Sequence, residues 1–183
     1  MASCPDCSFP LLGADGADVN LPGALRYDEA RSVGAAGRIR VLAGETAALL
    51  RSTSADRARR RPEPAVWSPL EYACHVRDVL LVQRERVLMM RRGLGDKVVP
   101  MGRDERVELD GYRAQDPVDV ATQLEQAAVM FEGVLAQLAP DDWDLTVVYN
   151  FPVRTEQNLR WVAVHTEHEV AHHLHDIRRD LAS

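Results

Sequence analysis

The sequence predicts an all-α protein built as a four-helix bundle with a long crossover between the second and third helices. Three observations support this prediction. Apolar residues recur at helical spacing in four long segments. Two of these segments open on a capping residue followed by proline. A stretch without sustained periodicity separates the middle pair. At 183 residues the chain suits one domain that can bury a core without disulfides.

The first helix is expected over residues 28–52. Its apolar face is formed by Ile39, Leu42, Thr46, Leu49 and Leu50. The residues before it contain Cys4 and Cys7 among prolines and glycines, without any helical period. We therefore expect an irregular N-terminal arm over residues 1–27 and the bundle over residues 28–183.

The second helix has the strongest start signal in the chain. Ser68 can cap it, Pro69 occupies the first helical position, and Glu71 completes a capping box. The helix is expected to run to about Arg92, and charged residues that repeat by sevens predict its solvent face. These residues are Glu71, Asp78, Glu85 and Arg92, with Arg77, Arg84 and Arg91 beside them. His75 lies on the opposite side and is expected to point toward the core.

The remaining elements follow from similar signals. Residues 93–116 are the expected crossover, and Asp116-Pro117 opens the third helix, which Ala139-Pro140 closes. Leu145 to Tyr149 could form a short strand-like excursion, and the fourth helix is expected over about residues 156–181. A bundle with one long middle connection can build a metal site from side chains on facing helices.

The fourth helix carries an unusual density of histidine. Five of the six histidines fall between residues 165 and 175, and they are His165, His168, His172, His173 and His175. Two donors spaced four apart on a helix share a face and can bind one ion. Glu169 and His173 form such a pair at the border of the apolar face. The other histidines are expected to face solvent, a loop or the N-terminal arm.

These residues predict a metal site formed by His75, Glu169 and His173. Two imidazoles and one carboxylate leave coordination positions open for water or substrate. Asp176 could support the site by accepting the other N–H of His173 or by anchoring an arginine. Zinc is the expected ion, although nitrogen and oxygen ligands also accept nickel, iron or manganese. The alternative is a polar helix whose histidines face solvent and whose Glu169 makes ordinary ion pairs.

Two stretches resemble a known family. W-S-P-L-E-Y-A-C-H-V-R-D-V at residues 67–79 and E-V-A-H-H-L-H-D-I at residues 169–177 resemble actinobacterial DinB-like proteins. The resemblance covers about residues 30–181. Such proteins usually bind a metal with one histidine of helix two and an H-x-x-x-H pair of helix four. Here Glu169 stands in place of the first histidine of that pair, and with His173 and Asp176 it resembles the E-x-x-x-H-x-x-D pattern of the branch that contains mycothiol-dependent maleylpyruvate isomerase.

This resemblance implies a metal-dependent thiol transferase or isomerase, in which the ion activates a small-molecule thiol of the mycothiol or bacillithiol type. The partners would be that thiol and an electrophilic substrate. A non-catalytic metal-binding stress or interaction protein is the alternative, and a hydrolase that uses metal-bound water is a third.

The N-terminal Cys4-Pro5-Asp6-Cys7 is half of a zinc-knuckle pattern. Cys74 could complete a second zinc site, and so could the outward histidines His168 and His172. A redox-active or incidental cysteine pair and a plain arm are the other interpretations.

Composition excludes several classes of protein. A net charge of −6 argues against a nucleic-acid-binding surface, and the sequence contains neither a membrane-spanning apolar run nor a signal pattern. Three cysteines, two of them close together, suit a reducing compartment, so we expect a cytoplasmic protein. A homodimer is also expected, because closed dimers are common among such proteins.

Overall fold

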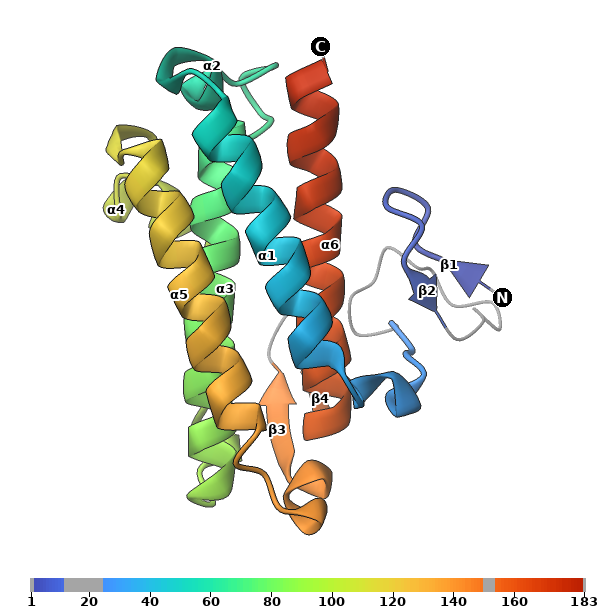
Figure 1. The fold of residues 1–183 in the computed structure, drawn as a ribbon. Coiled ribbons are helices and arrows are strands. Elements are labelled where there is room, and N and C mark those ends of the chain that lie inside the picture. The colour runs from blue at the N-terminus through green and yellow to red at the C-terminus, as the bar shows by residue number, and fades with distance from the viewer. Residues whose placement is uncertain (1, 12–24, 150–153, 183) are drawn as a thin grey trace.

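Four long helices form the body of the protein in the computed structural model, which describes residues 2–11, 25–149 and 154–182 (Figure 1). They are α1 (Ala35–Ser52), α3 (Pro69–Arg91), α5 (Pro117–Leu135) and α6 (Leu159–Ala182). Helices α1 and α3 lie at opposite corners, and each packs against both α5 and α6. The predicted all-α four-helix bundle is confirmed.

The direction of the helices explains the long crossover. Helices α1 and α6 run one way along the bundle, and α3 and α5 run the other way (Figure 1). The 23 residues of α3 span about 35 Å, and the chain must return over that length before α5 can start parallel to it. The predicted crossover does this through three short helices, η3 (Gly95–Lys97), α4 (Arg103–Leu109) and η4 (Tyr112–Ala114).

The predicted helix starts are largely confirmed. The Ser68 side chain accepts a hydrogen bond from the Glu71 N–H, and the Glu71 carboxylate accepts one from the Ser68 N–H, which is a complete capping box. Asp116 caps α5 in a similar way. The first helix is shorter than predicted, because η2 (Glu29–Ser32) and a left-handed Gly34 at φ 78° precede α1. The short helix α2 (Ala55–Arg59) follows α1.

Two small antiparallel hairpins complete the described fold. Strands β3 (Thr146–Tyr149) and β4 (Thr155–Asn158) pair just before α6 and follow the short helix η5 (Pro140–Asp144). Strand β3 confirms the strand-like excursion predicted for Leu145 to Tyr149, and residues 150–153 between the two strands lie outside the described residues. Strands β1 (Ala2–Ser3) and β2 (Pro10–Leu11) form a hairpin within the predicted arm, of which residues 12–24 lie outside the described part.

The core runs the length of the bundle. Its main part contains fully buried residues of all four long helices, among them Ile39, Leu80, Phe131 and Val162. A second cluster lies around Leu50, Leu70 and Ile177. In residues 2–11, 25–149 and 154–182 no helix has both the length and the apolar character needed to cross a bilayer.

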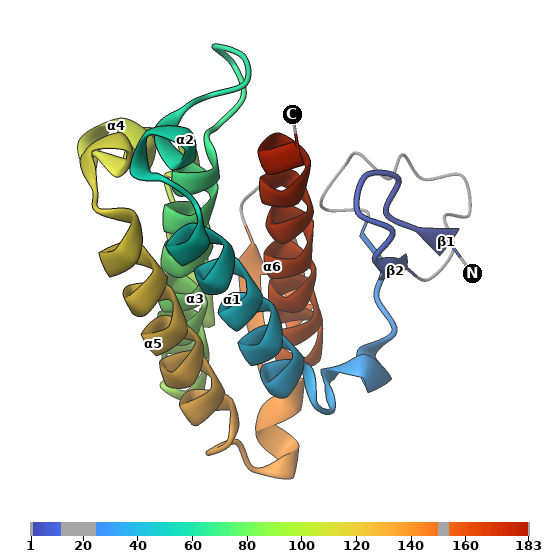
Figure 2. The same cartoon turned by 45° about the horizontal axis from the view of Figure 1, so that its top comes forward.

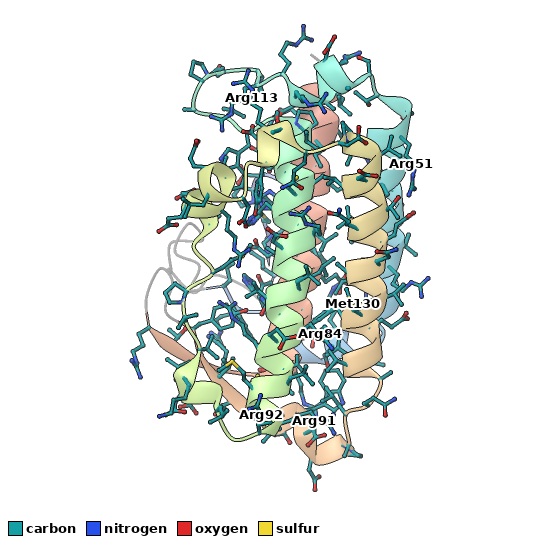
Figure 3. The ribbon with its side chains drawn as sticks, turned by 90° about the vertical axis from the view of Figure 1, so that its left-hand side faces the viewer. Arg51, Arg84, Arg91, Arg92, Arg113 and Met130 are labelled. Atoms are coloured by element: carbon teal, nitrogen blue, oxygen red, sulfur yellow. The ribbon has the colours of Figure 1, made fainter. Side chains whose placement is uncertain are left out.

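The predicted solvent face of α3 is wrong over the first half of that helix. Glu71, Arg77 and Asp78 are 1 %, 9 % and 5 % exposed. Arg61 forms an ion pair with Glu71, and Tyr112 of the crossover donates a 2.7 Å hydrogen bond to Asp78. The crossover and the segment before α3, which carries Arg61, therefore cover this face and supply partners for its charges. Only the second half of the helix is polar and open, and Figure 3 shows Arg84, Arg91 and Arg92 along it.

The described residues of the N-terminal arm, 2–11 and 25–27, lie against the outer side of α6, away from α5 (Figures 1 and 2). The ring of Phe9 stacks on that of His168 with centroids 4.6 Å apart, and Tyr27 packs edge-on against the same imidazole. The first part of α6 is therefore enclosed both by the bundle and by the arm. As a result, every residue from 161 to 168 is buried.

Candidate metal centre

His75 occupies the second turn of α3, on the side that faces α6. Its position follows directly from the capping box, because Ser68 and Pro69 fix where the helical period begins. The residue is 2 % exposed, which confirms the predicted inward orientation. Its ring lies between that of Trp67, at 5.2 Å, and that of His173, at 4.9 Å.

Glu169 and His173 lie one turn apart on α6 and face His75. The Glu169 Oε2 atom is 3.9 Å from His75 Nε2 and 3.8 Å from His173 Nε2. One ligand atom from each of the three residues lies within 4.8 Å of the others. An ion that sits about 2.0–2.2 Å from each ligand can bridge atoms separated by up to about 4 Å. The geometry thus brings together the three predicted ligands around a space that fits one ion.

The unpartnered ring nitrogens and the protonation state of His75 are those of a metal ligand. Both of its ring nitrogens are buried, and neither has a hydrogen-bond partner among the described residues. Burial lowers the pKa of His75, so the imidazole is neutral near pH 7 and carries a free lone pair. A buried polar atom without a partner is costly, and coordination of a divalent cation would remove that cost.

Glu169 provides the carboxylate of this group. Burial alone would raise its pKa, but the neighbouring imidazoles of His75, His165 and His173 hold the pKa of the Glu169 carboxyl well below its usual range. The group is therefore an anion, which is the form that binds a metal.

His165 also faces this carboxylate, with its Nε2 atom 3.9 Å from Glu169 Oε1. Its Nδ1 atom lies 3.1 Å from the Tyr27 hydroxyl. The sequence did not predict His165 as part of the site, because the residue lies off the apolar stripe of the fourth helix. Its four-residue spacing from Glu169 was the signal that could have placed it.

Asp176, the residue predicted to support the site, lies next to His173. Its Oδ2 atom lies 3.1 Å from His173 Nδ1, and its Oδ1 atom accepts a 2.9 Å hydrogen bond from Arg179. Burial tends to raise the pKa of Asp176, but its hydrogen bond with His173 and nearby positive charge lower the pKa overall. The carboxylate therefore holds the His173 Nδ1–H, which leaves Nε2 available toward Glu169.

Two cavities flank this ligand set. One, of about 650 Å³, is lined by His173 and Asp176 together with Trp67 and Tyr72. The other, of about 380 Å³, is lined by His75, Glu169 and His165 and by the side chains of Tyr149 and Trp161. Arg103 and Asp104 of the crossover contribute to both. Both volumes fall in the range of small-molecule sites.

The structure also brings together Cys4, Cys7, His168 and His172 on the outer side of α6. His168 and His172 are neither exposed nor directed into the bundle, and they face the arm, which was one of the predicted options. Cys74 does not belong to this group. It is buried in the second core cluster, and its thiol is 3.6 Å from the Gln115 side-chain oxygen. His175 is exposed.

The fold and the site define a class of protein, a four-helix bundle that gathers imidazole and carboxylate donors from facing helices. The family model of the DinB superfamily matches residues 39–177, and the chain belongs to this superfamily. The resemblance found in the sequence is thereby confirmed. Among curated protein sequences, none matches this chain significantly.

Two solved structures share the fold. YfiT from Bacillus subtilis, described as a "probable metal-dependent hydrolase with an unusual four-helix bundle topology", superposes with a TM-score of 0.72 and 9 % identity over 95 % of each chain. The mycothiol-dependent maleylpyruvate isomerase superposes with a TM-score of 0.62 and 12 % identity. That match covers 76 % of this chain and 57 % of the longer isomerase chain.

Proposed function

We propose that this protein is a metal-dependent enzyme that combines a small-molecule thiol with a small electrophile, as a transferase or an isomerase. The observation that carries the proposal is the pair of cavities on either side of the ligand set. His173 lines one cavity, whereas His75 and Glu169 line the other. Two reactants bound in these cavities would meet at the three proposed ligands, an arrangement that a two-substrate reaction requires.

The larger cavity suits the thiol cofactor. Its lining is rich in hydrogen-bonding groups, including Asp6, Glu63 and Arg179, and it offers the rings of Trp67 and Tyr72 as flat surfaces. Thiols of the mycothiol and bacillithiol type carry sugar hydroxyl groups, which such donors and acceptors can orient. We therefore assign the thiol to the cavity lined by His173.

The smaller cavity suits a compact electrophile. Apolar side chains such as Val79, Val82 and Met101 form much of its wall, and Arg86 and Arg103 also line it. Guanidinium groups bind carboxylates with two parallel hydrogen bonds. An unsaturated or oxo acid of small size would match this combination of apolar wall and cationic groups.

His75, Glu169 and His173 would hold the ion in this proposal. A divalent cation bound there would act as a Lewis acid that lowers the pKa of a thiol or a water molecule. The chain itself positions the reactants. Asp176 keeps the His173 ring in one orientation, and the buried surroundings of His75 exclude water from one side of the site.

Hydrolysis is a second candidate function. The fold match to YfiT covers nearly all of both chains, and that protein is described as a probable metal-dependent hydrolase. In this case one cavity would hold the substrate, and a water molecule would replace the thiol.

The test uses the zinc-loaded protein with mycothiol or bacillithiol and a panel of electrophiles that includes maleylpyruvate. The wild-type protein is expected to accelerate loss of the electrophile only when thiol is present. His75→Ala should lose this activity together with one metal equivalent, whereas His175→Ala, the exposed control, should keep both. Thiol-independent cleavage of esters or amides would favour the hydrolase. Full metal content without any turnover would favour a non-catalytic metal-binding protein.

A further inference from the structure

Four potential zinc ligands from two distant parts of the chain meet on the outer side of α6. Cys4 and Cys7 lie in the β1–β2 hairpin, and His168 and His172 lie one turn apart on α6. One ligand atom from each lies within 4.8 Å of the other three, and Cys4 Sγ is 3.8 Å from His172 Nδ1. Ligand atoms of a tetrahedral zinc are separated by about 3.4–3.8 Å, given the usual Zn–S and Zn–N distances. The group needs little movement to reach that geometry.

His168 provides independent evidence for a ligand at this place. Its Nδ1 atom lies 2.9 Å from the Tyr27 hydroxyl, while its Nε2 atom is buried and has no hydrogen-bond partner within the described part of the chain. The residue is only 5 % exposed, and Phe9 and Tyr27 hold its ring. Tyr27 thus fixes the ring through one nitrogen and leaves the other available, which is the arrangement of a metal-binding histidine.

The hairpin is shaped to present both sulfur atoms. The Cys4 N–H donates to the Phe9 carbonyl at 2.8 Å, and the Ser8 N–H donates to the Cys4 carbonyl at 2.9 Å. Ser8 has a φ of 61°, the left-handed conformation that closes this tight turn. In this turn both sulfur atoms lie close to the two histidines of α6.

We propose that Cys4, Cys7, His168 and His172 bind a second, structural zinc ion that attaches the N-terminal arm to α6. Two thiolates neutralise the charge of the ion, and four protein ligands leave no open position, which is characteristic of a structural site. The arm needs such a tie because its described hairpin, residues 2–11, is too short to bury a core of its own.

This zinc would also shape the proposed active site. Asp6, between the two cysteines, lines the 650 Å³ cavity. The Asp176 Oδ2 atom lies 3.7 Å from His172 Nε2 and 3.1 Å from His173 Nδ1, so one carboxylate faces a ligand of each site. The second zinc thus holds one wall of the larger cavity and lies next to the first site.

The test is the zinc content per chain of four proteins measured under reducing conditions. The wild type should contain two equivalents, and Cys4→Ser/Cys7→Ser and His75→Ala should each contain one. Cys74→Ser, the matched control for loss of a buried thiol, should contain two. A cysteine double variant with the metal content of the wild type would overturn the proposal.

A spectroscopic measurement avoids dependence on the folding of the variants. Wild-type protein reconstituted with Co²⁺ should show a sulfur-to-cobalt charge-transfer band and the intense visible bands of a tetrahedral ion. Absence of the charge-transfer band in folded, fully loaded wild type would refute the second site. These results are separate from those on the proposed activity, because His75→Ala should keep the sulfur band while it loses the activity and the metal of the bundle site.

Discussion

Asp176 offers a sharp test of how the proposed metal site of the bundle is supported. Its side chain is 8 % exposed and stands between His173 and Arg179. Replacement by asparagine keeps the shape and one oxygen acceptor but removes the negative charge. Replacement by alanine also removes the acceptor, so that nothing then holds the His173 ring with its Nε2 atom toward Glu169.

The expected loss of zinc affinity follows from the role of the Asp176 carboxylate beside His173. Loss of a carboxylate that orients a metal-binding histidine typically weakens metal binding by about 10- to 100-fold, or about 1.4–2.7 kcal/mol. The side-chain oxygen of an asparagine can still accept a hydrogen bond from the His173 N–H. We therefore expect Asp176→Asn to lower zinc affinity near 10-fold, at the lower end of this range. We expect a loss near 100-fold for Asp176→Ala, which has no acceptor.

The assay is a competitive zinc titration against a chromogenic chelator at pH 7. It should be performed in the Cys4→Ser/Cys7→Ser background, so that only the bundle site contributes. Asp180→Asn is the matched control, because Asp180 lies one turn further along α6 and also pairs with Arg179. Wild-type affinity in Asp176→Ala would refute the orienting role. An equal loss in Asp180→Asn would show that general electrostatics, and not the His173 contact, is responsible.

Two further predictions concern the stability of the folded protein. After chelation, the protein should lose stability between pH 7 and pH 5.5, because a histidine with a lowered folded pKa binds its proton mainly in the unfolded state. The histidines whose pKa burial lowers are His75, His165, His168 and His172. Each of them should contribute up to about 1 kcal/mol to this loss of stability. Equal free energies of urea unfolding at the two pH values would contradict the prediction. Replacement of Glu167, which is 1 % exposed and pairs with Arg31 and Arg38, by glutamine should lower the free energy of unfolding by about 2 kcal/mol. A change no larger than that of the exposed control Glu45→Gln would show that these ion pairs do not stabilise the packing of η2 and α1 on α6.

Most of the bundle could be predicted from local patterns. The capping box at Ser68 fixed the start of α3, and the start of α3 in turn fixed the inward direction of His75. Likewise, the apolar stripe of the last helix placed Glu169 and His173 at the edge of the core. These inferences succeeded because the helical period and the end caps depend only on residues a few positions apart.

The polar faces were harder to predict. The charges of Glu71 and Asp78 suggested a solvent face, yet both side chains are buried. A helical pattern shows which face is apolar, but it does not show whether a distant segment will cover the polar face. Such a face can be buried when the covering segment supplies hydrogen bonds and opposite charges, as Arg61 and Tyr112 do here.

The sequence by itself therefore determined the four long helices, the crossover and the inward direction of His75, because short-range periodicity and capping dictate them. Only the tertiary structure decided that the arm lies on α6, that Cys4 and Cys7 meet His168 and His172, and that two cavities flank the ligand set. Those features depend on contacts between segments more than 100 residues apart, such as that of Tyr27 with His168. No local pattern encodes such contacts, because they arise from the packing of complete elements against one another.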